Sequence, residues 1–156
     1  MRGDMRRLAG GLLPGGDAVS GSVTVFRIQD EAGRGPFKTG FSRVWLRDRP
    51  DHENLRPWTE QFKVHDILFR AGGLHVGCAC RTVDQLRRWF TLDEYLPLLI
   101  CGYDAVSLDA DRVLGESDIQ IVFARRRRLS DGAVPFALYG EAYHTPIPGT
   151  KHSGRP

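Results

Sequence analysis

Apolar side chains gather in short runs that predict β-strands. Val23–Ile28 is rich in β-branched and aromatic residues, and Asp104–Leu108 and Ile119–Ala124 share this character. Weaker runs predict further strands at Leu74–Cys80 and Phe136–Tyr139. The chain is therefore expected to contain a sheet of several short strands.

Two helices are predicted between the second and third of these strands in chain order. Thr82–Gln85 and Thr91–Glu94 both match a capping box, in which a Thr and a Gln or Glu three residues later satisfy free backbone amides. The second helix should run to about Ile100 and end at Gly102. Pro97 lies inside it and predicts a kink or a later start.

The order of the elements favours an α+β domain over a doubly wound sheet. After the first strand we expect a short helix or irregular loop around Phe41–Arg47 and a long loop from Asp48 to Glu60. Strands and helices do not alternate regularly. We therefore predict two or three helices packed on a mostly antiparallel β-sheet, either continuous or split.

Length and composition indicate a single globular domain with flanking segments. A chain of 156 residues with 41% hydrophobic and 26% charged residues is ordinary for a soluble protein. The glycine-rich residues 1–22 predict a disordered extension, residues 23–143 the folded domain, and residues 144–156 a flexible tail.

Charge and cysteine content only slightly narrow the range of possible functions. The net charge of +3 favours acidic partners such as nucleic acid. The three cysteines cannot all pair, and no apolar run approaches the roughly 18 residues of a membrane span, so a cytoplasmic protein is expected. No metal site is predicted, because His75 in an extended strand would face away from Cys78 and Cys80.

The segments around Gly102–Val106 and Gly115–Phe123 resemble the C-terminal half of the ADP-ribosyltransferase fold. There, a strand with the sequence Gly-Tyr-Asp precedes a strand that ends in an apolar pair and Phe. The order of an arginine-bearing strand, a glycine-containing strand and a capped helix is also similar. The resemblance implies a split sheet that binds NAD as a substrate, and transfer of ADP-ribose to a protein or nucleic-acid acceptor.

The same resemblance implies roles in NAD binding for four residues. Arg27 would contact a phosphate or ribose through its bidentate guanidinium. Gly77 would let the nicotinamide ring approach the backbone, His75 would contact the ribose or pyrophosphate, and Thr82 would replace the hydroxyl residue of the family. Simpler alternatives are an exposed or carboxylate-paired Arg27, a half-buried His75 and a Thr82 that only caps its helix.

The catalytic glutamate of the family aligns near Ile119 or Gln120, neither of which is acidic. Glu116 and Asp118 lie just upstream, and we expect their side chains to share one face of an extended strand with Gln120. A carboxylate is needed because positive charge develops at the sugar carbon. The sequence permits either a shifted carboxylate or a glutamine that binds NAD without efficient transfer.

A run of four arginines supports a second hypothesis. Arg125, Arg126, Arg127 and Arg128 would alternate sides along a strand, where they could contact phosphates or form a solvated strand end. The alternative function is a non-catalytic binding module or inhibitor, encoded by a phage or mobile element, that engages nucleic acid or an acidic protein partner.

Overall fold

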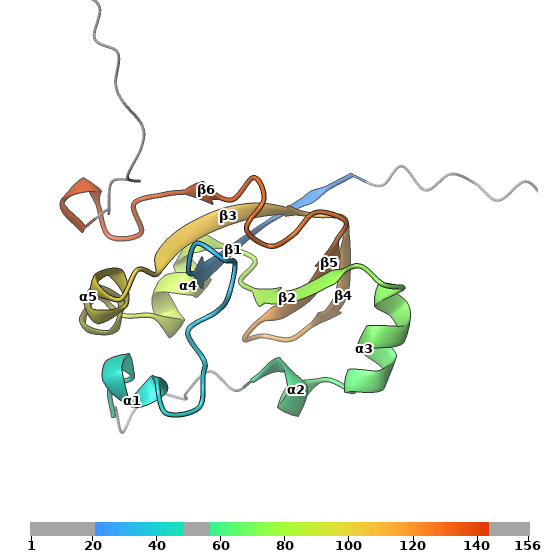
Figure 1. Ribbon diagram of the computed structural model, residues 1–156, viewed down its shortest axis with the longest axis horizontal. Helices are drawn as coiled ribbons and strands as arrows, with labels where there is room; N and C mark the ends of the chain where they lie inside the picture. Colours follow the sequence, from blue (N-terminus) through green and yellow to red (C-terminus); the bar gives the residue numbers. More distant parts are fainter. Residues whose placement is uncertain (1–20, 49–56, 144–156) are drawn as a thin grey trace, which may run out of the picture.

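The structure is a computed structural model that describes residues 21–48 and 57–143 (Figure 1). The predicted tail, and all but the last two residues of the predicted N-terminal extension, lie outside the described residues. In the described part no helix is long and apolar enough to cross a membrane.

The strands are β1 (Val23–Gln29), β2 (His75–Ala79), β3 (Asp104–Ala110), β4 (Arg112–Glu116), β5 (Ile121–Arg125) and β6 (Val134–Pro135). The helices are α1 (Ser42–Trp45), α2 (Trp58–Gln61), α3 (Val64–Ala71), α4 (Val83–Trp89), α5 (Leu92–Ile100) and the 3₁₀ turn η1 (Glu141–Tyr143).

The strands form two three-stranded antiparallel sheets, which confirms the α+β class and the split sheet. One sheet has the order β1-β3-β6 and the other β2-β5-β4. A single bridge joins them among the described residues. The Phe26 N–H donates to the Cys80 carbonyl at 3.0 Å, and the Cys80 N–H donates to the Phe26 carbonyl at 2.7 Å. Beyond this pair β1 and β2 do not pair, which leaves space between the two sheets.

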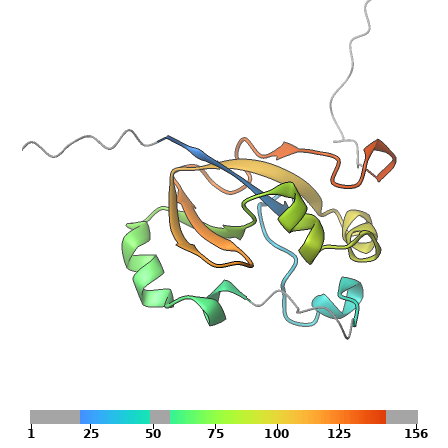
Figure 2. The same ribbon diagram turned by 180° about the vertical axis from the view of Figure 1, so that it is seen from behind.

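Apolar side chains hold both sheets in one folded unit. A central cluster takes Val25 and Leu108 from the first sheet and Ile121 and Phe123 from the second. Helices α4 and α5 contribute to a cluster on the first sheet, and α3 contacts β4 and β5 through Ile67 and its neighbours. Figures 1 and 2 show α4 and α5 at one end of the molecule and α3 at the other.

The two predicted helices have the expected ends. The Thr82 hydroxyl accepts a hydrogen bond from the Gln85 N–H, although the Gln85 side chain accepts from Arg81 rather than from Thr82. The Glu94 carboxylate accepts from the Thr91 N–H, as a capping box requires. Pro97 stays inside α5, and Gly102 follows the helix with a φ of +82°.

Several elements differ from the sequence expectations, among them helix α2, which begins inside the loop predicted for Asp48–Glu60. Helix α3 was not predicted, although Val64, Ile67 and Ala71 have helical spacing within a region that is otherwise polar. Strand β4 forms a hairpin with β5, where the sequence predicted only one strand, at Ile119–Ala124. The last strand is Val134–Pro135 rather than Phe136–Tyr139, because Phe136 and Tyr139 pack on the core beside the first sheet.

Candidate functional site

A cavity of about 390 Å³ lies where the two sheets diverge. The segments that enclose it are β1, the turn that follows it, the start of α2, β2, the β4–β5 turn and the loop after β5. The described residues that line it are Arg27, Gly33, Arg34, Gly35, Phe37, Pro57, Trp58, Thr59, Val76, Gly77, Cys78, Gln120 and Leu129. Because these segments are far apart in sequence, the cavity exists only in the folded chain.

The Arg27 guanidinium is the most unusual group of this cavity. Arg27 is only 6% exposed, and its Nε and Nη1 atoms have no hydrogen-bond partner among the described residues. Burial lowers its pKa, and an arginine guanidinium nevertheless keeps its proton in a protein. A buried positive charge without a direct partner is costly, and an anion that reached it would remove much of that cost.

Neighbouring groups do not neutralise Arg27. The Asp30 carboxylate favours the charged form of Arg27, but it is already bound by Arg34 at 2.9 Å and lies 3.8 Å from Lys38. Burial raises the pKa of the Cys78 thiol and raises that of Cys80 to about 12. Both sulfur atoms are therefore protonated near neutral pH and supply no negative charge.

Two glycines leave room for the guanidinium. A Cβ at Gly77 would lie 2.6 Å from Arg27 Nη1, and a Cβ at Gly35 would lie 3.4 Å from Nη2. The first distance is a clash and the second an ordinary contact. Gly77 is thus required for the position of Arg27, a role that the sequence did not suggest.

Three of the residues predicted to bind or act on NAD line the cavity, namely Arg27, Gly77 and Gln120. The other two predicted NAD-binding residues are not among its lining. His75 is exposed at the start of β2, and Thr82 is exposed at the N-terminus of α4, where it caps the helix.

The predicted arrangement of Glu116, Asp118 and Gln120 on one strand face is wrong. Glu116 ends β4, and Ser117 starts a tight turn in which its hydroxyl accepts from the N–H groups of Ile119 and Gln120, both at 3.2 Å. Glu116 instead forms a salt bridge of 2.8 Å with Arg81, whose hydrogen bonds lower the pKa of the Glu116 carboxyl. Asp118 is exposed. The described lining of the cavity contains Gln120 but no carboxylate.

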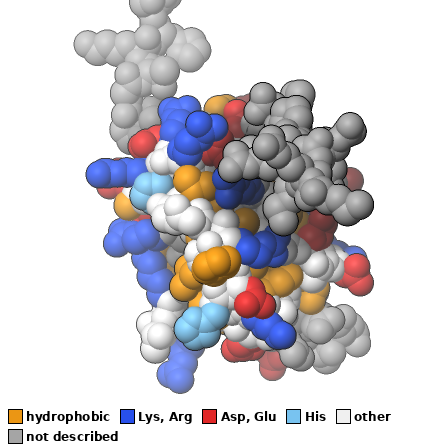
Figure 3. Space-filling model, turned by 90° about the vertical axis from the view of Figure 1, so that its right-hand side faces the viewer, with side chains coloured by type: hydrophobic (Ala, Val, Ile, Leu, Met, Phe, Trp, Pro, Cys, Tyr) orange, Lys and Arg blue, Asp and Glu red, His pale blue; other side chains and the backbone are white. Residues whose placement is uncertain are grey.

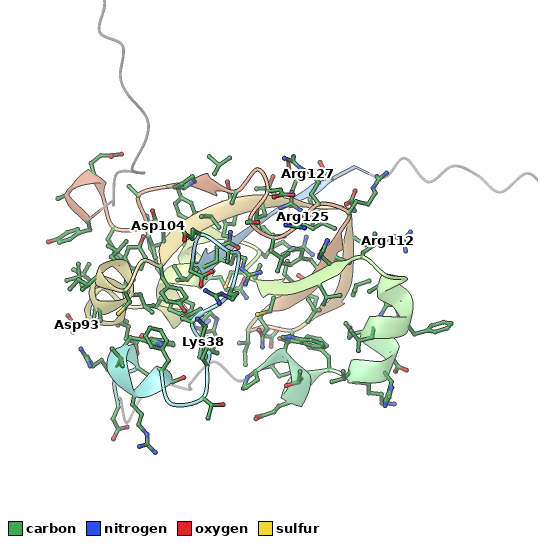
Figure 4. All side chains as sticks on the ribbon, viewed as in Figure 1. Lys38, Asp93, Asp104, Arg112, Arg125 and Arg127 are labelled. Atoms are coloured by element: carbon green, nitrogen blue, oxygen red, sulfur yellow. The ribbon has the colours of Figure 1, made fainter. Side chains whose placement is uncertain are left out.

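The four arginines after Ala124 do not alternate along a strand, because β5 ends at Arg125. The Arg125 side chain is buried and donates to the Asp131 carbonyl at 3.0 Å. Arg126 forms a salt bridge of 3.1 Å with Asp111, while Arg127 and Arg128 are exposed. Figure 4 shows Arg125 and Arg127 close together near the end of β5.

The sequence did not identify Gly35, Phe37 or Leu129 as part of a site. The available signal was the glycine-rich turn directly after the Arg27 strand, because such a turn brings the backbone close to the strand it leaves. Among the described residues, no group of three or more His, Cys, Asp and Glu side chains could hold a metal ion.

Comparisons with known proteins place the chain in a family. No curated protein and no solved structure matches it. One family matches residues 22–135, which include all six strands and the residues that line the cavity. Its description names a phage protein and no activity. Because the match covers well over half of the sequence, the chain belongs to the family described as Bacteriophage T4 Y00F protein.

Proposed function

We propose that this chain is a non-catalytic phage binding module or inhibitor that holds an anionic group of its ligand on Arg27. The observation that carries the proposal is the buried guanidinium, which borders the cavity and has two nitrogens without a partner among the described residues. The cavity volume of about 390 Å³ suits a small organic ligand. Phe37 and Trp58 supply aromatic surface for a planar part of that ligand.

The absence of a carboxylate from the described lining favours binding over ADP-ribosyl transfer. Transfer requires negative charge beside the sugar carbon from which nicotinamide departs. Gln120 is at the cavity but carries no charge, and Glu116 is engaged by Arg81.

A second candidate function is an NAD-dependent ADP-ribosyltransferase with a protein or nucleic-acid acceptor. The specific support for it is that Arg27, Gly77 and Gln120 line the same cavity. NAD is thus one of the ligands to test. In both cases we place the site of action in the cytoplasm of the host cell.

Calorimetric titration with AMP, inorganic pyrophosphate and NAD tests the binding proposal. We expect at least one of them to bind the full chain. Gly77→Ala should weaken binding about tenfold or more, because the displaced guanidinium loses a charge-assisted hydrogen bond. Gly21→Ala is the control, because a Cβ there would meet nothing within 4 Å and the residue lies outside the cavity lining, and it should change affinity less than about threefold. If none of the three compounds binds the wild-type chain, the Arg27 cavity is not an anion site.

Nicotinamide release separates the two candidate functions. The binding module should release no nicotinamide from NAD, with or without added protein and nucleic-acid acceptors. Release that is lost in Gln120→Ala but retained in His75→Ala would overturn the non-catalytic proposal and support the transferase.

A further inference from the structure

A second basic site lies at the edge of the molecule formed by α3, β4 and the loop after β5. Its exposed arginines are Arg70 at the end of α3, Arg112 at the start of β4, and Arg126, Arg127 and Arg128 after β5. Arg112 donates to the Arg70 carbonyl at 3.5 Å and pairs across the strands with Ala124. Arg70 in turn donates to the Leu114 carbonyl of β4 at 2.6 Å, and Arg126–Arg128 follow β5, the strand that pairs with β4. We name these five arginines the arginine edge.

The arginine edge carries a net positive charge. Asp109, Asp111 and Asp131 are the acidic residues that act on the nearby Arg125, and Asp111 directly pairs with Arg126. With Arg125 included, six arginines meet these three aspartates and Asp66, one turn before Arg70 on α3, which leaves an excess of two positive charges. Figure 3 looks at this side of the molecule, where Lys and Arg side chains lie around exposed hydrophobic ones.

An exposed aromatic residue directly precedes Arg70 in the chain. Phe69, next to Arg70 on α3, is 88% exposed, while Ile67 and Ala71 form the buried side of the helix. The ring therefore adds little to the core. An exposed ring beside guanidinium groups is the combination with which proteins hold single-stranded nucleic acid, because bases stack on the ring and phosphates pair with the cations.

We propose that the arginine edge, with Phe69, binds single-stranded nucleic acid. Planar guanidinium groups bind phosphates in a bidentate manner, and the single ring accepts any base, so we expect little sequence preference. This site is separate from the anion site, since neither Phe69 nor any arginine of the edge is among the residues that line the Arg27 cavity.

Fluorescence anisotropy with labelled twenty-nucleotide dT and rU oligonucleotides tests this proposal. We expect binding to the full chain that weakens with added salt. Replacing Arg112, Arg127 and Arg128 together by Gln should weaken it at least tenfold and make it less dependent on salt. The matched control replaces Arg43, Arg47 and Arg88, which are exposed on α1, after α1 and on α4, and removes the same charge. An equal loss in both triple variants would show attraction to overall charge and overturn the proposal.

The aromatic contribution has its own control. Phe69→Ala should weaken oligonucleotide binding about tenfold. Ile100→Ala removes a hydrophobic side chain that is 86% exposed on α5 and should leave binding unchanged. Gly77→Ala should also leave oligonucleotide binding unchanged, so the proposal for the anion site and the proposal for the arginine edge can be refuted separately. Absence of oligonucleotide binding by the wild-type chain, or binding that does not depend on Phe69, would contradict the proposed site.

Discussion

Arg27 is held in place at a cost to the stability of the unliganded protein. Two of its nitrogens lack partners among the described residues, and its side chain is buried. Evolution retains such groups where a ligand uses them, which is the usual trade of stability for function. Arg125 is also buried and its Nε and Nη1 likewise lack partners among the described residues, but its Nη2 donates to the Asp131 carbonyl and, unlike Arg27, it does not line the cavity.

We predict that Arg27→Met raises the free energy of unfolding by about 1–3 kcal/mol, because an apolar chain of similar size replaces a buried unpaired charge. Urea denaturation of the unliganded chain measures the change. Arg43→Met, at an exposed position of α1, should alter the same quantity by less than about 0.5 kcal/mol. A strong loss of stability in Arg27→Met would mean that the guanidinium is well paired.

At the level of elements, local chemistry predicted some features well and others not at all. The strand Val23–Gln29 and the capped helices α4 and α5 follow from β-branched runs and capping residues. The β4–β5 hairpin was missed because its turn is set by Ser117, whose hydroxyl accepts two backbone hydrogen bonds. This turn separates Glu116 from Gln120, and the predicted catalytic arrangement failed with it.

The end of α5 permits a direct test of a backbone effect. Gly102 has a φ of +82°, and the N–H groups of Gly102 and Tyr103 donate to the Leu99 and Leu98 carbonyls. We predict that Gly102→Ala lowers the free energy of unfolding by about 1–2 kcal/mol, because a Cβ disfavours the left-handed conformation.

Thermal and urea denaturation of Gly102→Ala measure this effect. A Cβ at Gly102 would meet nothing within 4 Å, so a loss of stability cannot come from a clash. Gly21→Ala is the control, since that position is equally open and has no positive φ. Equal stability of the two variants would show that the end of α5 does not depend on a left-handed residue at position 102.

At the scale of the whole molecule, the site could be predicted only in part. Arg27, Gly77 and Gln120 came from short motifs, and all three line the cavity. Phe37 and Trp58 join them through the chain path, which no local pattern specifies. The separation of β1 and β2 after one bridge is likewise a property of the packed sheets rather than of either strand.

The shared central cluster predicts that both sheets unfold together. Phe123→Ala should lower the free energy of unfolding by about 3–5 kcal/mol, because a fully buried ring leaves a cavity between the sheets. Amide hydrogen exchange should accelerate in β1, β3, β2 and β5 by similar factors. Phe69→Ala, at an exposed position, should leave these rates unchanged. Acceleration confined to β2 and β5 would indicate two independent folding units.

Position 77 offers a way to follow the proposed anion site across the members of the family. Because a methyl group there would displace the Arg27 guanidinium, a relative can accept a larger residue at this position only if it has given up or rebuilt the charged pocket. A homologue that keeps both the glycine and the arginine should share the ligand, while one that has lost the glycine should have lost the ligand too. The residue pair at positions 27 and 77 therefore predicts which members of the family bind the ligand.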